Sequence, residues 1–278
     1  DQAEVLREEG KWKEAAKAYG KSLDADESQF LVHVRYQQVV ALSGEGADEL
    51  FAGYELPMVQ AAEFEERRGH ESTEARRHEG GGAFQLRSNA WMSREVKPVV
   101  LRPDIWRGLE QDAELVAWYG EEFEACEAGA GEPLQAHLNF HRRVNLAGLL
   151  QRLDTATMLD GVEGRTPLAD VAVAAFAEGL PMGEKFAVGP GGGTKLALRR
   201  AFAERLPEAV VQRPKASFPL PFQQWVGDHA AALKRSALAR LMFNDAAIES
   251  IGAEPGKMWN LAWPMINLAM WGERWWGR

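Results

Sequence analysis

The chain has 278 residues, of which 46% are hydrophobic and 26% charged, a composition that indicates a globular protein with a substantial core and excludes a wholly disordered one. Its 32 basic and 41 acidic residues give a formal net charge of −9, which excludes a main role in coating nucleic acid or an anionic membrane. The single cysteine, Cys126, can form neither an internal disulfide nor a thiolate zinc site. Since no apolar run reaches about 20 residues and no signal-peptide pattern is visible, we expect a cytoplasmic protein that binds neither nucleic acid nor membrane.

Residues 1–30 predict a helical hairpin. Small and aromatic residues recur at helical spacing on both sides of Gly10 in the phrase LREEGKWKEAAKAYGKSLDAD. This phrase resembles one tetratricopeptide repeat, and a lone repeat cannot bury its own apolar face. We therefore expect the hairpin to dock on a protein partner; an ordinary amphipathic helical hairpin is the alternative.

The next segment joins a predicted strand to a glycine loop. Residues 36–42, YQQVVAL, form a β-branched apolar run typical of a buried strand, and residues 43–54, SGEGADELFAGY, follow it. Gly44 and Gly46 make a tight loop, after which a helix is expected to begin. A strand, a glycine loop and a helix N-terminus together present backbone N–H groups to an anion, and Asp48 is close enough to hold a divalent metal. Taken alone this pattern is weak, because many turns contain glycine and acidic residues.

The rest of the chain predicts a mostly helical body. Residues 59–90 are polar and contain three consecutive glycines, which indicates an exposed loop, whereas apolar residues recur at helical spacing over residues 108–240. The terminal WNLAWPMINLAMWGERWWGR holds five of the ten tryptophans, a pattern typical of core or interface. His137 and His141 are four residues apart without a matching acid or thiolate, so we interpret them as ordinary helix residues.

Four stretches match one family in order. They are SGEGADELFAGY (43–54), LLQRLDTATMLDGVEGRTPLAD (149–170), TKLALRRAFAERLPEAVVQRPKASFPLPFQQW (194–225) and INLAMWGERW (266–275). Together they resemble the synthetase domain of asparagine synthetase and its relatives, so residues 31–278 are expected to form the later part of such a domain. The resemblance implies an α/β fold: a nucleotide-binding α-hydrolase-like parallel sheet with a large helical portion, preceded here by the helical hairpin.

The resemblance also implies ATP-dependent amide formation. A small-molecule or peptide carboxylate is adenylated with ATP and Mg²⁺, and ammonia or another amine then displaces AMP. Ser43, Gly44 and Gly46 are the candidate nucleotide-binding residues, and Asp48 matches a position that helps to hold Mg²⁺. A non-catalytic interaction protein is the alternative function.

Two residues are catalytic candidates from the same resemblance. Lys215, in the run RPKASF, matches the lysine that faces the phosphates, where an ammonium group can neutralise the departing pyrophosphate. Glu45 matches the acid that takes part in the proton transfer of the attacking ammonia. A β-lactam-forming branch of the superfamily has Tyr at this position, so Glu45 indicates the asparagine-synthetase type. Without the family, an exposed lysine such as Lys215 is most often merely solvated. Glu163 and Arg165 also match family positions, but we expect them to form a buried pair that braces helices.

Two parts of the family do not occur in these residues. The glutaminase domain begins with a catalytic cysteine, whereas this chain begins with Asp1 and has its only cysteine in the middle, so we expect no glutamine hydrolysis and a separate glutaminase or a free amine as nitrogen donor. The pyrophosphatase loop, Ser-Gly-Gly-x-Asp-Ser, is also absent. Three explanations remain open: a sequence taken from a longer enzyme, one half of a split synthetase, or a degenerate synthetase fold that serves as a binding module.

Overall fold

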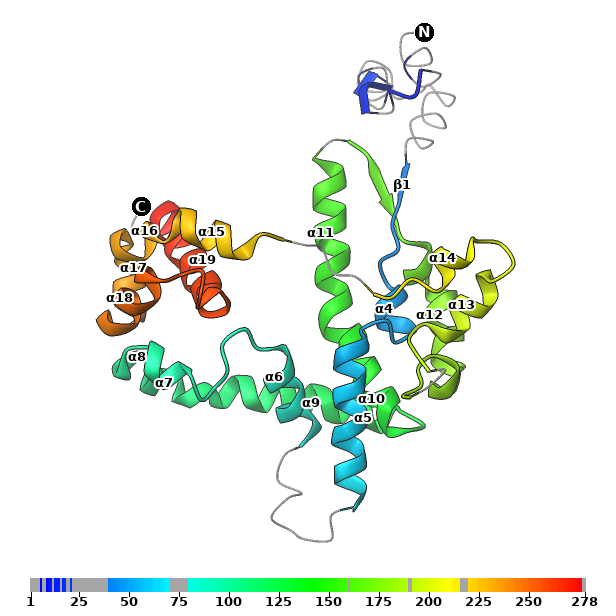
Figure 1. Cartoon of the computed structure of the whole chain (residues 1–278), viewed down its shortest axis with the longest axis horizontal. Helices are drawn as coiled ribbons and strands as arrows, with labels where there is room; N and C mark the ends of the chain where they lie inside the picture. The colour runs from blue at the N-terminus through cyan, green and yellow to red at the C-terminus, as the bar shows by residue number, and fades with distance from the viewer. Residues whose placement is uncertain are drawn as a thin grey trace. The chain divides into compact units, whose positions relative to one another are not determined.

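A computed structural model of the chain describes residues 6, 9–11, 13–15, 17–18, 21, 40–70, 80–159, 161–189, 192–215 and 220–276. The hairpin predicted over residues 1–30, and the domain boundary after it, lie for the most part outside these ranges. The described residues are mostly helical, with a small parallel sheet (Figure 1). Contacts divide the chain into two compact units, residues 1–70 with 126–215 and residues 71–125 with 216–278.

The first unit combines the described strands with helices from two stretches of the chain. Its elements are β1 (Val40–Leu42), α4 (Ala47–Leu50), α5 (Glu55–His70), α10 (Pro133–His141), the π-turn Arg142–Leu146, α11 (Ala147–Met158), β2 (Glu163–Arg165), the 3-10 turn Pro167–Ala169, α12 (Val171–Gly179), the 3-10 turn Met182–Glu184, α13 (Leu196–Phe202) and α14 (Glu208–Val211).

Strands β1 and β2 pair in parallel, in the register Val40↔Glu163, Ala41↔Gly164 and Leu42↔Arg165. Parallel strands need a long crossover, and here the chain between them includes α10 and α11. Helix α11 packs against β2. Within the described ranges the sheet has these two strands alone, so the prediction of a parallel sheet is confirmed only in this small form.

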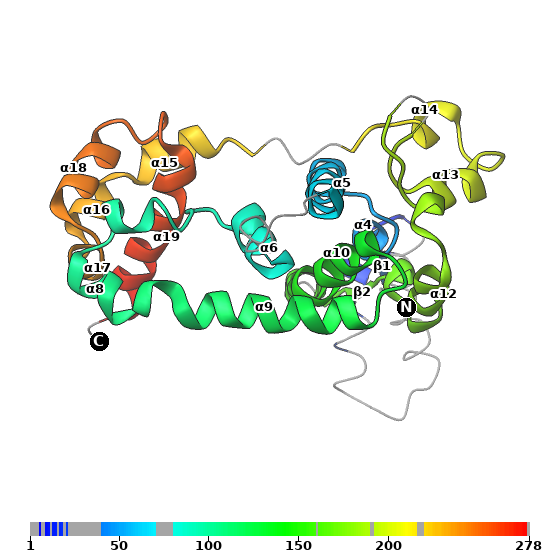
Figure 2. The same cartoon turned by 90° about the horizontal axis from the view of Figure 1, so that it is seen from below.

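Helix α4 follows β1 in the chain and lies beside it (Figure 2). Two small hydrophobic clusters hold α4 in place. On one side, Leu50 and Phe51 pack with Ala177 of α12. On the other side, Ala52 follows α4 and packs with Met58 of α5 and with residues of α10. Because apolar contacts hold the carboxyl end of α4 in two clusters, the polar residues that precede it, Asp48 and Glu49, have a defined position.

The second unit is helical in its described residues. Its elements are α6 (Gly81–Asn89), α7 (Lys97–Val100), α8 (Pro103–Gly108), the 3-10 turn Glu110–Asp112, α9 (Ala113–Ala128, which continues into the first unit), α15 (Phe222–His229), α16 (Ala231–Arg235), α17 (Ala237–Met242), α18 (Asp245–Ala253) and α19 (Trp259–Trp275).

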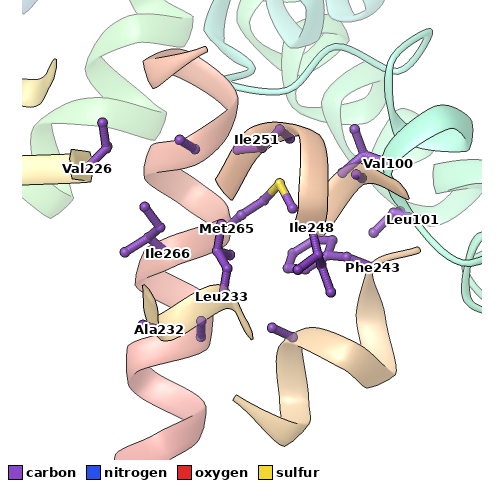
Figure 3. Packing of buried hydrophobic residues seen from close by; sticks show 14 residues of the cluster. Val100, Leu101, Val226, Ala232, Leu233, Phe243, Ile248, Ile251, Met265 and Ile266 are labelled. Carbon is purple, nitrogen blue, oxygen red and sulfur yellow. The ribbon is translucent and has the colours of Figure 1, made fainter. Parts of the chain in front are cut away.

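The core of the second unit forms around α19. Figure 3 shows Met265 of α19 facing Ile248 and Ile251 of α18, all three buried. The tryptophans of α19 divide between two environments, since Trp259 packs against this core whereas Trp275 is exposed. No helix in the described ranges is both long and apolar enough to cross a bilayer.

The exposed loop predicted over residues 59–90 is wrong where the structure describes it, because α5 and α6 are helices there. The glycines that suggested a loop allow close packing instead. A Cβ on Gly81 would lie 2.0 Å from the Phe123 ring, and one on Gly82 would lie 2.5 Å from the carbonyl oxygen of Tyr119. Residues without a Cβ let α6 approach α9, a requirement that composition does not reveal.

Candidate functional site

The loop between β1 and α4 turns sharply at Gly46. Its backbone has φ 93° and ψ −20°, in the left-handed region that favours glycine. A Cβ here would lie 3.0 Å from backbone atoms of Ala169, so the loop packs directly on the turn that follows β2. The N–H of Ser43 donates to the carbonyl of Arg165 at 2.8 Å, which extends the strand pairing into the loop. The start of α4 is therefore fixed against β2 and its following turn.

Asp48 on α4 contacts two lysines from distant parts of the chain. The Nζ of Lys195, just before α13, lies 2.7 Å from Oδ1, and the Nζ of Lys215, after α14, lies 2.7 Å from Oδ2. The Asp48 side chain is 14% exposed. We call these three residues the lysine–aspartate trio. Two ammonium groups on one carboxylate leave a net positive charge, which suits an anionic ligand.

The two lysines keep Asp48 ionised. Burial alone would raise the pKa of Asp48, but the hydrogen bonds and positive charges of Lys195 and Lys215 outweigh burial, and the pKa is lowered from its ordinary value of 3.8. The carboxylate is therefore charged at neutral pH, and both ion pairs persist.

Tyr54 packs against the trio through its ring. The Nζ of Lys215 lies 5.5 Å from the ring centroid, a cation–π contact, and the Tyr54 hydroxyl donates to Oε1 of Glu49 at 2.5 Å. Glu49 is 1% exposed. Burial, followed by the hydrogen bond to Glu49, raises the pKa of Tyr54 well above its ordinary value, so the hydroxyl remains a donor. Adjacent residues of α4 thus bind different partners: Asp48 the lysines and Glu49 the tyrosine.

Gly53 provides the space for the contact between Asp48 and Lys195. A Cβ at Gly53 would lie 1.9 Å from Oδ1 of Asp48 and 2.2 Å from Cε of Lys195. Real Cβ atoms do not approach other atoms so closely. Glycine is therefore required at this position for the trio to form.

The two histidines predicted as helix residues lie on α10, as expected. The Nε2 of His137 lies 2.9 Å from Oε1 of Glu65 on α5, which joins the two helices. Burial, followed by the charge of His137, lowers the pKa of His141 to about 4, so His141 is neutral at physiological pH. Its Nδ1 lies 3.3 Å from the side-chain amide of Asn145.

Comparison with known proteins assigns the chain to a family. The model of the family described as asparagine synthase matches residues 9–273. The chain belongs to the asparagine synthase family. Three curated relatives, putative glutamine-hydrolyzing asparagine synthetases from Mycobacterium bovis and two strains of Mycobacterium tuberculosis, are 31% identical over 216 residues. These matches cover 67% of this chain and 30% of each relative, so the chain spans less than a third of their length. No solved structure matches it.

The structure places the candidate residues of this asparagine synthase family member as follows. Ser43 and Glu45 lie half-buried in the loop, whereas Gly44 is exposed and has open space where a Cβ would be. Glu45 also contributes to the raised pKa of Tyr54, which places its charge within electrostatic reach of the tyrosine. Lys215 is brought to Asp48 although they are far apart in sequence.

One residue of the trio was missed by sequence reasoning. Lys195 lies in the family-like stretch TKLALRRAF, which was its only available signal. Its backbone has φ 55° and ψ 34°, and its N–H donates to the carbonyl of Phe51 at 3.1 Å. This left-handed conformation, which is rare outside glycine, directs the lysine at α4, and no local pattern predicts it.

The predicted buried Glu163–Arg165 pair is wrong in one respect. The Arg165 Nη2 lies 2.6 Å from Oε1 of Glu163, so the pair forms, but the side chains are 62% and 42% exposed. Alternate residues of a strand share one face, and this face of β2 is open. The pair therefore lies at the surface and braces no helices.

A pocket of about 550 Å³ opens beside Lys215. Its lining includes Thr194, Arg199 and Arg200, together with the glycines that precede α13. The pocket gives a ligand access to one lysine of the trio. In the part of the chain that the structure describes, no group of three or more His, Cys, Asp or Glu residues could hold a metal by itself.

Proposed function

We propose that this chain is the synthetase part of an enzyme that activates a carboxylate with ATP and then joins an amine to it. The observation that carries this proposal is the contact between Lys215 and Asp48, 2.7 Å long, which joins two of the family-like stretches. The net positive charge of the trio and the adjoining pocket support a site for a polyphosphate. The proposed acceptor is a small-molecule or peptide carboxylate, with aspartate as the default.

In the first step, a carboxylate oxygen bonds to the α-phosphorus of ATP, and the bond to pyrophosphate breaks. Negative charge grows on the departing pyrophosphate. Lys215 and Lys195 are held side by side by Asp48, and two preorganised ammonium groups can neutralise that charge without moving far. Asp48 thus keeps two like charges together before the substrate arrives.

In the second step, the amine nitrogen bonds to the carbonyl carbon, AMP leaves, and the nitrogen loses a proton. We assign that proton to the carboxylate of Glu45. This role requires the Glu45 carboxylate to come within hydrogen-bond distance of the nitrogen. Because Gly46 packs against Ala169, the loop that carries Glu45 has a fixed position. Ser43 and Gly44 precede Glu45 in the same loop and are proposed to contact the nucleotide.

Magnesium fits this site only as part of a nucleotide complex. Mg²⁺ is commonly held by one or two carboxylates together with substrate phosphates and water, and Asp48 provides one such carboxylate. The ion would supply further neutralisation of phosphate charge. Residues beyond the described ranges, or beyond these 278, would have to complete its coordination.

A second candidate function is a non-catalytic interaction module, which one observation favours. Leu42, Leu159, Val171 and Phe176 of the first unit are strongly exposed apolar residues. Exposed apolar side chains of this size are contacts that a partner protein can cover. Such side chains favour a surface that binds a partner protein, and a measurement of activity decides between the two functions.

The proposed function is tested by isotope exchange between ATP and pyrophosphate in the complete enzyme that contains this chain. We expect exchange that depends on a carboxylate, and a loss of about 10²-fold or more in Lys215→Ala, the scale for removing one preorganised charge. Lys257→Ala is the matched control, because Lys257 is an exposed lysine paired with Glu254 in the second unit. Unchanged exchange in Lys215→Ala would contradict the assignment, and no exchange with any carboxylate would favour the interaction module.

A further inference from the structure

The guanidinium group of Arg199 binds three backbone carbonyl groups. Its Nε donates to Thr194 at 2.7 Å, its Nη2 donates to Arg213 at 3.1 Å, and its Nη1 donates to Val211. Arg199 lies on α13; Thr194 precedes α13, whereas Val211 is the last residue of α14 and Arg213 follows it. One side chain therefore connects two separate segments of the backbone.

Both segments carry a lysine of the trio. Thr194 directly precedes Lys195, and Arg213 lies two residues before Lys215. Arginine has five donors in a rigid planar arrangement, so it can hold several carbonyls at fixed relative positions. A lysine at position 199 has a single ammonium group on a flexible chain and cannot reproduce this geometry.

The two lysines differ in how firmly the backbone holds them. Lys195 is fixed by its own N–H, which donates to Phe51, and by its carbonyl, which accepts from the N–H of Arg199 at 2.9 Å. Residues 213–215 have no regular secondary structure and are exposed. The contact of Arg199 with Arg213 is therefore an anchor close to Lys215 on an otherwise irregular segment.

We propose that Arg199 is a positioning residue that sets the separation of Lys195 and Lys215, so that both ammonium groups reach Asp48 together. Its partners are neutral carbonyls, so the arginine also retains its positive charge near the trio. The importance of this positioning for catalysis rests on the proposed function. The restraint that Arg199 places on the two lysines can be measured without turnover.

The test is site-specific acylation of lysines by an amine-reactive acetyl ester, followed by peptide mass spectrometry, in wild type and Arg199→Lys. We expect the labelling rates of Lys195 and Lys215 to rise about tenfold, which corresponds to about 1.4 kcal/mol of lost restraint. Lys185 is the internal control for unfolding, because it is fully buried in the same unit and its Nζ donates to Gln135 at 2.5 Å. Its labelling should not change.

Arg200→Lys is the matched variant, since Arg200 is the neighbouring arginine and pairs with Glu184. It should leave Lys195 and Lys215 as protected as in wild type. Unchanged labelling of both lysines in Arg199→Lys would overturn the proposal. A parallel rise at Lys185 would also overturn it, because the arginine would then support the unit as a whole. If the labelling rates rise in Arg199→Lys as expected but the complete enzyme shows no pyrophosphate exchange, the result contradicts the proposed function and not the positioning role of Arg199.

Discussion

The Nζ of Lys215 lies 2.7 Å from Oδ2 of Asp48, although the two residues are 167 positions apart in the chain. This contact joins α4, which follows the glycine loop, to the segment after α14. With Lys195 on the other carboxylate oxygen, it makes Asp48 the centre of the candidate site.

Glu45→Gln preserves the size of the side chain and removes the base. We expect exchange between ATP and pyrophosphate to survive in the complete enzyme, whereas amide formation falls by about 10²-fold or more, the scale for loss of a general base. Both rates are measured in the same preparation. An equal fall in the two rates would contradict a specific role of Glu45 on the amine.

Gly53→Ala places a Cβ where Asp48 and Lys195 meet. Because neither neighbour can withdraw without breaking the ion pair, we expect a loss of about 1–3 kcal/mol in the free energy of unfolding, measured by urea denaturation. Gly69→Ala on α5 is the control, since a Cβ there meets nothing within 4 Å. It should change stability by about 0.5 kcal/mol or less. Equal effects of the two substitutions would show that the space at Gly53 is not required.

The stabilisation by Asp48 should depend on pH. Its folded pKa is lowered from 3.8, so the ionised carboxylate stabilises the fold above the unfolded pKa and loses this contribution as the pH falls through the folded value. The difference in the free energy of unfolding between wild type and Asp48→Asn should be constant near neutral pH and should shrink as the pH falls below 3.8. Urea denaturation at a series of pH values measures it. A difference that stays constant down to the lowest pH measured would show that the charge of Asp48 does not stabilise the fold.

Tyr54→Phe removes the donor to Glu49, which is 1% exposed. Leaving a buried carboxylate without this partner should cost about 1–3 kcal/mol of stability. A double-mutant cycle with Glu49→Gln isolates the contact, because the same tyrosine change should cost less when position 49 is uncharged. The same cost in both backgrounds would mean that the hydroxyl acts through other atoms.

The isolated 278-residue chain should bind Mg·ATP weakly. It contains the loop at residues 43–48 but no Ser-Gly-Gly-x-Asp-Ser sequence. Under the proposed function, such a loop would add two or three charge-assisted contacts to the phosphates. At about 1.5–3 kcal/mol for each, their loss weakens binding by several orders of magnitude, to about millimolar or weaker. Calorimetric titration measures the affinity. Micromolar binding would show that another phosphate-binding loop exists in this sequence.

Local patterns predicted those parts of the fold that depend on neighbouring residues. The expected strand before the loop appears as β1 in its last three residues, and the loop does lead into a helix, α4. The three consecutive glycines before residue 83 led to the wrong prediction, because the same residue that loosens a loop also lets α6 pack closely on α9. Composition does not distinguish these two uses of glycine.

The sequence by itself determined the family of this protein, the glycine loop with its acidic residues, and Lys215 as a candidate, because motif order and residue type suffice for these. Only the tertiary structure decided that Lys195 completes the trio, that Gly53 makes room for it, and that Arg199 holds both lysine segments. These features depend on contacts between residues far apart in the chain and on a left-handed backbone at Lys195. Such contacts are set by the packing of α4, α12 and α13, which no local periodicity specifies.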